Sequence, residues 1–394
     1  MRTSRLPVGG ANVFQRIRAK RAEALERGMT LLDLSIGEPK GPALKSAREA
    51  ASAAVMSDDE AMHAYQYNAS PAVPGFSERF VAAHSNRGLS GADVAYLPIS
   101  GIKPSLGLLP LACGCALGPV TVRTATKPGY PIPADWCAYH PHVTHEPLGM
   151  SAANVFRPDA ADIPPATGLV MLNYPHNPSG QIATKDWWRE VCAHCAEHDI
   201  RLFNDAAYIA LGHDDANTAL AEVAVDFPEL SWCEAFTAAK LIGNGTGWHV
   251  GALVGSPDFV ADVAEVKGKT DAGFVAPMAA GALAALEDDQ ASIDAMRETY
   301  HARLGLLMEL MQAAGMRLAI EPRAGFYTLW RTPARAFGEP VTDAETFNAR
   351  MIDETGVVGV PFAGYLRYAV CVDVAAIADD LAQAFEKADV AYGD

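Results

Sequence analysis

Lys240 is the side chain in this sequence whose surroundings most suggest chemistry. It lies in the stretch 234–251, EAFTAAKLIGNGTGWHVG, where small residues and four glycines surround a single amine. One strand is expected to end near Phe236 and the next to begin at Val250, so the lysine sits on a tight backbone and is expected to face a bound group at close range. Such an amine can form a Schiff base with a carbonyl compound. A solvated loop lysine is the alternative, since lysines are mostly exposed.

The sequence around Lys240 alternates between strand and helix patterns. From about residue 94 to 266, short apolar strands and helices follow one another with short connections. The run 168–172 is apolar throughout, as expected for a strand covered on both faces. This alternation predicts an α/β fold with a mostly parallel, doubly wound sheet.

The last third of the chain has a different pattern. Residues 278–314 are almost entirely helix-forming, with a break expected near Asp288, and later strands are expected at 325–330 and 365–372. We therefore expect an N-terminal arm that joins a small domain (1–44), a large domain (45–287) and a small α+β C-terminal domain (288–394). Three local expectations are a strand at 31–36, a single helix at 104–113 and a surface loop around the histidines of 140–145.

Composition narrows the classes of function. Lys and Arg number 31 against 47 Asp and Glu, a net charge of −16, which argues against a nucleic-acid partner and an anionic membrane surface. Seven scattered cysteines favour reduced thiols. The opening residues 1–10 are basic without an apolar core, so no signal peptide is expected. No apolar run reaches the roughly 18 residues of a membrane span, and a cytoplasmic protein is expected.

Polar side chains follow the expected strands, and ligands of open α/β sheets bind at the carboxyl ends of strands. A turn that leads into a helix suits a phosphate. A carboxylate after a buried strand calls for a cation, although Asp205 could instead cap the next helix. With an amine, amide and phenol donors and an aromatic ring, these groups match the needs of pyridoxal 5'-phosphate. The positions are 100–103, Tyr130, 173–180, Asp205, Tyr208, Thr237 and Lys240.

The sequence resembles the class I/II aminotransferases, which belong to the fold-type I, aspartate-aminotransferase-like pyridoxal-phosphate enzymes. The resemblance runs from Leu34-Ser-Ile-Gly-Glu-Pro39 to Arg367, nearly the whole chain. Segment 173–180, Asn-Tyr-Pro-His-Asn-Pro-Ser-Gly, is similar to the family's Pro-x-Asn-Pro-Thr/Ser-Gly motif. The resemblance implies a ping-pong transfer of an amino group between an L-amino acid and a 2-oxo acid through a Lys240 Schiff base. Residues in family-like order and spacing are Asn177, Asp205, Tyr208, Lys240 and Arg367.

The resemblance also implies a role for each site residue. The catalytic residues would be Lys240, which forms the Schiff base and moves a proton, Asp205, which keeps the pyridine nitrogen protonated, and Tyr208, which bonds the phenolic oxygen of the cofactor. Arg367 would grip the substrate carboxylate in a bidentate fork, and Gly37 would lie against the substrate. The other expected contacts are Asn177 at the phenolic oxygen and the substrate, Tyr130 on the ring, Gly101, Ile102, Lys103, Thr237 and His249 at the phosphate, and Tyr67 at the phosphate of a neighbouring subunit, which implies a homodimer.

Three features depart from the family pattern. His249 stands where the family usually places an arginine for the phosphate, and Lys103 is expected to supply the missing charge. Ala239 replaces the serine that commonly precedes the lysine, and the segment before Arg367 lacks the longer glycine-rich loop usual there. The stretch 266–273, Val-Lys-Gly-Lys-Thr-Asp-Ala-Gly, resembles the Lys-x-Asn-x-Asp-Ser-Gly of diaminopimelate aminotransferases, so the sequence leans toward that branch.

Other activities stay open at this point. The departures near His249 and Arg367 motivate an elimination, cyclisation or oxidation on the same scaffold. A non-enzymatic sensor of amino acids with the same fold is a further alternative, but the chain has no basic segment before Leu34 that suggests a DNA-binding unit. A metal site is not expected, because Cys192, Cys195 and the nearby histidines lie on one predicted helix without a second ligand pair.

Overall fold

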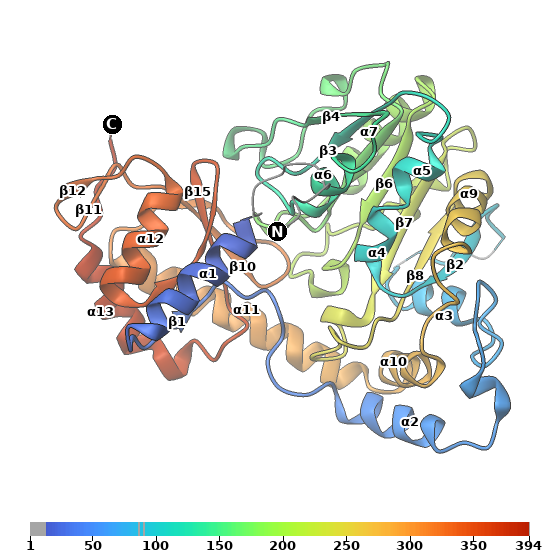
Figure 1. The fold of residues 1–394 in the computed structure, drawn as a ribbon, viewed down its shortest axis with the longest axis horizontal. Helices are drawn as coiled ribbons and strands as arrows, with labels where there is room; N and C mark the ends of the chain where they lie inside the picture. The colour runs from blue at the N-terminus through green and yellow to red at the C-terminus, as the bar shows by residue number, and fades with distance from the viewer. Residues whose placement is uncertain (1–12, 86, 90, 394) are drawn as a thin grey trace, which may run out of the picture.

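The computed structural model describes residues 13–85, 87–89 and 91–393, so the opening segment examined for a targeting signal lies outside it. A seven-stranded sheet forms the centre of the larger part of the molecule (Figure 1). Its strand order is β2-β8-β7-β6-β5-β3-β4. The strands are β2 (Ala95–Ile99), β3 (Val120–Thr124), β4 (Val143–Pro147), β5 (Leu169–Leu172), β6 (Arg201–Asp205), β7 (Trp232–Thr237) and β8 (Gly251–Gly255).

Strand direction brings six strand ends to one edge of this sheet. The pairs from β7 through β6, β5 and β3 to β4 are parallel, whereas β8 is antiparallel to both of its neighbours, β7 and β2. The carboxyl ends of β2 to β7 therefore lie at a common edge, where β8 begins. This arrangement confirms the mostly parallel, doubly wound sheet that the sequence predicts.

Helices cover both faces of the sheet because the buried strands are apolar on both sides. In β5, Val170 and Leu172 pack into one core cluster, while Leu169 and Met171 pack into another on the opposite face. The first cluster includes residues of α2 (Lys45–Val55), α3 (Phe76–Ala82), α7 (Lys185–Glu197), α8 (Ala221–Ala224) and α10 (Ala276–Asp288). The second includes residues of α4 (Ile102–Leu106), α5 (Leu109–Ala112), α6 (Ile132–Cys137) and α9 (Pro257–Lys267).

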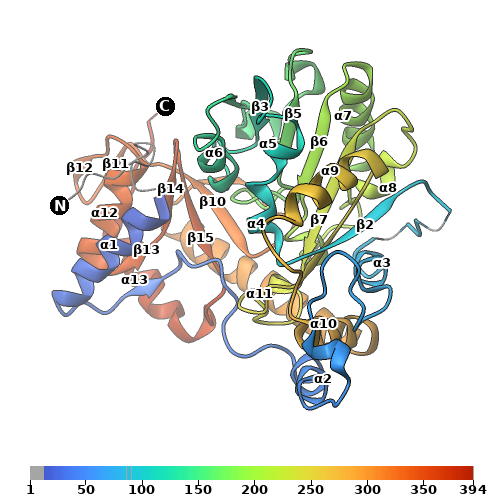
Figure 2. The ribbon, with the colours of Figure 1, turned by 45° about the vertical axis from the view of Figure 1, so that its right-hand side comes forward.

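A smaller sheet with its own helices lies beside this body (Figures 1 and 2). Four antiparallel strands form it in the order β14 (Val360–Phe362), β15 (Tyr365–Ala369), β10 (Tyr327–Arg331) and β9 (Leu318–Ile320). The helices α1 (Val13–Glu26), α11 (Gln290–Ala313), α12 (Ala344–Thr355) and α13 (Ala378–Ala388) accompany it, with the short pairs β1 (Leu32–Asp33) with β13 (Val357–Val358) and β11 (Arg335–Ala336) with β12 (Glu339–Pro340). The expected domain boundaries near residues 44 and 287 stay a prediction.

Short 3₁₀ helices complete the described elements, and they occupy turns between the larger ones. They are η1 (Glu60–His63), η2 (Ala152–Asn154), η3 (Ala160–Asp162), η4 (Ile209–Leu211), η5 (Ala238–Lys240) and η6 (Ala375–Ile377). Within the described ranges, no helix combines the length and the apolar character needed to cross a bilayer.

Several local expectations need correction. The single helix expected at 104–113 is two short helices, α4 and α5, with Gly107 between them packed so closely that an added Cβ would lie 2.7 Å from Trp136. The strand expected at 31–36 is only β1. The stretch expected to be a loop around His145 contains the edge strand β4, where the imidazole Nε2 lies 2.7 Å from the hydroxyl of Thr124. The expected break near Asp288 is confirmed, since α10 ends there.

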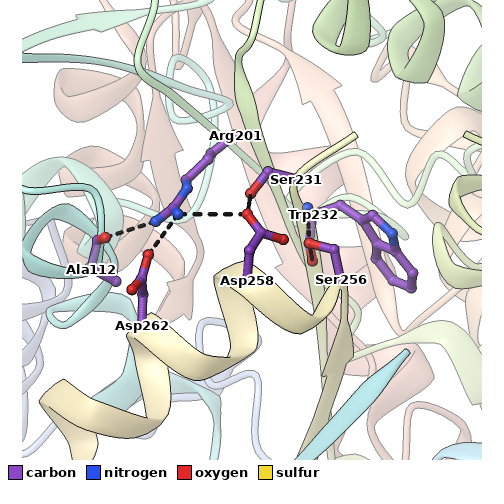
Figure 3. Close-up of polar contacts among 7 residues, drawn as sticks. All are labelled: Ala112, Arg201, Ser231, Trp232, Ser256, Asp258 and Asp262. Atoms are coloured by element: carbon purple, nitrogen blue, oxygen red, sulfur yellow. Dashed lines mark hydrogen bonds and ion pairs between the residues drawn. The ribbon is translucent and has the colours of Figure 1, made fainter. Parts of the chain in front are cut away.

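At the opposite edge of the large sheet, where the parallel strands begin, one arginine connects several elements (Figure 3). Arg201 opens β6 and donates to the carbonyl oxygen of Ala112 at 2.7 Å and to Asp262 Oδ2 at 2.6 Å. Asp258 lies within 3.6 Å of the same guanidinium and accepts from the Ser231 hydroxyl at 2.5 Å. These contacts join β6 to α5 and α9, so we assign Arg201 a structural role at this edge of the sheet.

Candidate active site

A cavity of about 460 Å³ lies at the edge where the parallel strands of the large sheet end. Strand ends of the large sheet, the small sheet and α1 all contribute to its wall. The structure places there every site residue expected from the sequence except Tyr67. The lining residues are Phe14, Gly37, Ser100, Gly101, Ile102, Lys103, Pro104, Tyr130, Asn173, Asn177, Asp205, Ala207, Tyr208, Thr237, Ala239, Lys240, Thr246, His249, Tyr327 and Arg367.

Lys240 ends the short helix η5, which follows β7 directly and carries the amine into the cavity. Its Nζ donates to the carbonyl oxygen of Gly37 at 2.8 Å and lies 5.9 Å from the ring centre of Phe326. Burial lowers the pKa of this amine, which Cys371 and Glu38 partly offset. A lowered pKa increases the neutral fraction of the amine, and the neutral form is the nucleophile.

Asp205 is the last residue of β6, and it is buried with 6% of its surface exposed. Among the described residues, its carboxylate accepts one hydrogen bond, from the Ala207 N–H at 3.1 Å. Burial raises its pKa to about 7, against the opposing effects of that N–H and of Lys240. A buried carboxylate with so few partners is stabilised by a cation placed beside it.

Arg367 projects from β15 and is 1% exposed. Its Nη1 donates to Asn177 Oδ1 at 2.9 Å and its Nη2 donates to the Ser35 carbonyl at 2.8 Å. Its Nε is buried and has no hydrogen-bond partner among the described residues. Because a guanidinium carries five N–H donors, two fix its orientation and the others are available to an anion.

Two phenols and a glycine that line the cavity lie against one another. The hydroxyls of Tyr208 and Tyr327 lie 3.0 Å apart. An added Cβ on Gly37 would lie 1.9 Å from the Tyr327 hydroxyl, so only glycine fits beside that phenol. Burial raises the pKa of both phenols, so both are protonated at neutral pH.

The expected phosphate contacts lie together at the β2 and β7 ends of the cavity. Gly101 has φ +90°, a conformation that favours glycine, and α4 begins directly after it. The Thr237 hydroxyl accepts from the Ala239 N–H at 3.2 Å, and His249 adopts a left-handed φ of +54° just before β8. Lys103 and His249 are exposed side chains on the cavity wall.

Tyr67 lies outside this cavity. Its side chain is 59% exposed, next to Tyr65 with ring centres 5.5 Å apart. The Tyr67 backbone is held by a 2.7 Å bond from its N–H to the Ala272 carbonyl. This placement leaves the ring free on the surface of one chain, and its role stays a prediction.

Sequence reasoning missed several lining residues. Tyr327 and Phe14 come from β10 and α1, outside the large sheet, and in sequence they look like ordinary core aromatics. Ser100 and Asn173 begin segments that the sequence did single out, but they received no role of their own. For Tyr327, the sequence indicated a site only through the glycine and two aromatic residues at 325–327, a pattern that is equally typical of the start of a strand.

The fold and the site together define a fold-type I, pyridoxal-phosphate-dependent transferase. The residues present fit that cofactor, because the buried carboxyl of Asp205 needs a cationic partner and the amine of Lys240 stands in the same cavity. The chain belongs to the aminotransferase class I and II family, whose match spans residues 30–379. The resemblance stated from the sequence is thereby confirmed.

Curated relatives are aminotransferases, and solved structures share the fold. The chain is 27% identical to an LL-diaminopimelate aminotransferase of Syntrophobacter fumaroxidans, over 95% of each chain. It is 28% identical to another of the same name from Desulforudis audaxviator, over 90% of this chain and 88% of that one. In structure it is similar to the aspartate aminotransferase of Rhizobium meliloti, with a TM-score of 0.85, 20% identity and coverage of 99% and 98%.

A second solved structure has an equally close fold. Substrate-bound BacF from Bacillus subtilis superposes with a TM-score of 0.84 at 19% identity, and each chain is covered completely. The protein is thus a pyridoxal-phosphate-dependent aminotransferase that acts on amino acids and 2-oxo acids. The elimination, cyclisation or oxidation left open by the sequence is not favoured.

Proposed function

We propose that the Lys240 cavity carries out amino transfer from an L-amino acid to a 2-oxo acid, with the residue roles expected from the sequence. The observation that carries the proposal is the convergence of the Lys240 amine, the buried Asp205 carboxyl and the buried Arg367 guanidinium on one cavity. Bound pyridoxal phosphate supplies a carbonyl carbon for the Schiff base and a ring that takes up electrons. The protein supplies proton transfer, orientation and charge.

Proton transfer falls to Lys240 and Asp205. The Lys240 amine, with its pKa lowered by burial, takes the proton from the Cα of the substrate as a general base. The Asp205 carboxylate holds a proton on the ring nitrogen, since an ion pair there removes the cost of its burial. Both roles depend on burial near the end of a strand, which lowers the pKa of the Lys240 amine and raises the pKa of the Asp205 carboxyl.

Substrate orientation falls to Arg367 and Asn177. Since Asn177 Oδ1 already accepts from Arg367, its side-chain NH₂ is left to donate to the phenolic oxygen of the cofactor, next to Tyr208. The remaining donors of the guanidinium form the fork for the substrate α-carboxylate, beside Gly37. Tyr130 stacks on the ring, and Gly101, Ile102, Lys103, Thr237 and His249 bind the phosphate.

We propose LL-diaminopimelate as the first amino donor to test, since relatives over 90% or more of this chain carry that name. The assay is a donor–acceptor screen of the purified holoenzyme. A productive donor converts the cofactor absorbance near roughly 420 nm to that of the amine form near roughly 330 nm. If no amino donor produces this conversion, amino transfer at this site is refuted, whereas conversion by other donors alone refutes only the substrate.

The Lys240→Ala variant tests the site assignment directly. It should lose turnover with every donor and lack the roughly 420 nm band, because that band requires the lysine Schiff base. Lys185→Ala removes an exposed lysine at the start of α7 and should behave as the wild type. Turnover retained by Lys240→Ala would contradict the assignment.

We further propose a cytoplasmic homodimer in which Tyr67 reaches the cofactor phosphate of the neighbouring subunit. Seven free thiols support a reducing compartment, and the exposed Tyr65–Tyr67 pair supports an interface. The test mixes inactive Tyr67→Ala and Lys240→Ala chains. Hybrid dimers should regain activity, because one of their two sites then has both wild-type residues, and a mixture without recovery would argue against the exchange.

A further inference from the structure

Tyr327 contacts three residues that the sequence predicts to act at the site, namely Tyr208, Arg367 and Gly37. It lies on β10, is 3% exposed and lines the cavity. Its hydroxyl is 3.0 Å from that of Tyr208, and its ring centre is 4.2 Å from the guanidinium carbon of Arg367. The same hydroxyl fills the space that a side chain at Gly37 would need, next to the carbonyl that accepts from Lys240.

We propose that Tyr327 is a positioning residue for amino transfer, with its hydroxyl donating to Tyr208 and its ring holding the Arg367 guanidinium in place. The inference rests on the proposed function of this cavity. It assigns Tyr327 two separable tasks, one carried by the hydroxyl and one by the ring.

The direction of the hydrogen bond follows from the number of protons available. Both phenols are protonated, and they share one contact of 3.0 Å, so one of them donates to the other. The proposed role of Tyr208 commits its proton to the phenolic oxygen of the cofactor. Its own oxygen then serves as the acceptor, and Tyr327 is the donor. A donor at that oxygen polarises the Tyr208 hydroxyl and strengthens its donation.

The ring acts on the other half of the site. The Arg367 guanidinium is oriented by its hydrogen bonds to Asn177 and Ser35, and its central carbon lies over the ring of Tyr327, 4.2 Å from the ring centre. Stacking of this kind on a desolvated guanidinium restricts tilting, because the cation is attracted to the ring face. The carboxylate fork therefore depends on the ring and not on the hydroxyl.

Two variants separate the tasks, and a third is a matched control. Tyr327→Phe removes only the hydroxyl, whereas Tyr327→Leu removes the ring as well. Tyr368→Phe removes another buried tyrosine hydroxyl, on the neighbouring strand β15, that has no hydrogen-bond partner in the described structure. Each holoenzyme is titrated from pH 5 to 10 by absorbance, which gives the pKa of the Lys240 Schiff base without turnover. KM and kcat for the amino donor are then measured.

Tyr327→Phe should raise the Schiff-base pKa by roughly 0.3 to 1 unit, because a weaker Tyr208 donor stabilises the negative phenolic oxygen less and the imine proton is held more tightly. Its KM should stay within about twofold of the wild type, since the ring remains. Tyr327→Leu should give the same shift in pKa and a KM increased roughly tenfold. Tyr368→Phe should change neither quantity.

Two results overturn the inference while leaving the proposed function intact. One is a Schiff-base pKa in Tyr327→Phe that is equal to or lower than the pKa measured for the wild type. The other is an unchanged KM in Tyr327→Leu. A wild type in which no amino donor converts the roughly 420 nm band refutes the proposed function, and the inference falls with it.

Discussion

Replacing Asp205 with asparagine should stabilise the cofactor-free protein at alkaline pH while strongly slowing amino transfer. Asp205 is 6% exposed, and within the described part of the chain its carboxylate accepts a single hydrogen bond, from the Ala207 N–H. Burial raises its pKa to about 7 from the ordinary 3.8. A rise of about three units means that the ionised carboxylate costs the folded state about 4 kcal/mol. Asparagine has the same shape and no charge, so the variant escapes this cost.

The effect has a defined pH window. Below pH 3.8 the carboxyl is protonated in both folded and unfolded states, and it contributes nothing to the pH dependence. Between that pH and about 7, the folded state retains a proton that the unfolded state releases, so stability falls as pH rises. Above about pH 7 the full cost is present. Between pH 5 and pH 8 the wild type should therefore lose about 3 kcal/mol through this group.

Urea unfolding of the cofactor-free proteins at pH 5 and pH 8, followed by tryptophan fluorescence, measures this difference. Asp205→Asn should show a shallower fall in stability, and at pH 8 it should be more stable than the wild type by about 2 to 4 kcal/mol. In the holoenzyme, kcat should fall at least roughly 10²-fold, because the ring nitrogen loses its anionic partner. A variant that is less stable than the wild type at pH 8, or that keeps the full pH slope, would refute the reasoning.

Glu234→Gln is the matched control for that experiment. Glu234 is also fully buried with a pKa raised by burial to about 7. Its oxygens, however, accept from Asn204 at 2.7 Å and from the N–H groups of Leu220 and Ala221 at 3.0 and 2.8 Å. Glutamine turns one of these acceptors into a donor, so a buried N–H is left unpaired at a cost of about 1–3 kcal/mol. This variant should bind the cofactor normally and gain less stability at pH 8 than Asp205→Asn.

Three further predictions test other parts of the molecule. Arg367→Lys keeps the charge but loses the fork, so kcat/KM should fall roughly 10²-fold in steady-state assays, and a fall below about threefold would contradict the fork. Gly37→Ala pushes a Cβ to 1.9 Å from the Tyr327 hydroxyl, so its Schiff-base pKa should rise as in Tyr327→Phe; an unchanged absorbance titration would contradict this. Arg201→Met removes the contacts in Figure 3 and should lower the unfolding free energy by about 1–2 kcal/mol with kcat unchanged, whereas a lowered kcat would link that edge to the cavity.

The large sheet could be predicted because its strands are buried on both faces. The run 168–172 has no polar residue, so its prediction as a buried strand is clear. The observed strand β5 begins one residue later than this run. The edge strand β4 has the sequence Val-Thr-His-Glu-Pro and is mostly exposed, so its pattern resembles a loop. The break at Gly107 depends on contact with Trp136, which is distant in sequence, and no local rule contains that information.

The half of the site on the large sheet could be predicted for a topological reason. Asp205 ends a parallel strand, and Asn177 and Lys240 each follow one; the carboxyl ends of parallel strands share one edge. The other half comes from the small sheet and α1. The position of Arg367 relied on the family resemblance. Tyr327 lies at the end of the pairing between β10 and β15, opposite Ala369, which is two residues from Arg367 on the same strand. The register between β10 and β15 places Tyr327 in the cavity. This register between strands distant in sequence cannot be recognised from a single sequence.

Burial links the chemistry of the site to its instability without cofactor. The desolvation that lowers the pKa of Lys240 also raises that of Asp205, so the cofactor-free cavity holds two groups in unfavourable environments. With the proposed residue roles, a bound ring nitrogen would give Asp205 a cationic partner, and the Lys240 amine would be taken up in a Schiff base. The cofactor should therefore stabilise the wild type more strongly than Asp205→Asn, because only the wild-type carboxylate has a burial cost to recover. The measurement is the increase in melting temperature when each protein is saturated with cofactor. Equal increases for the wild type and Asp205→Asn would show that cofactor binding does not relieve the cost of burying the Asp205 carboxylate.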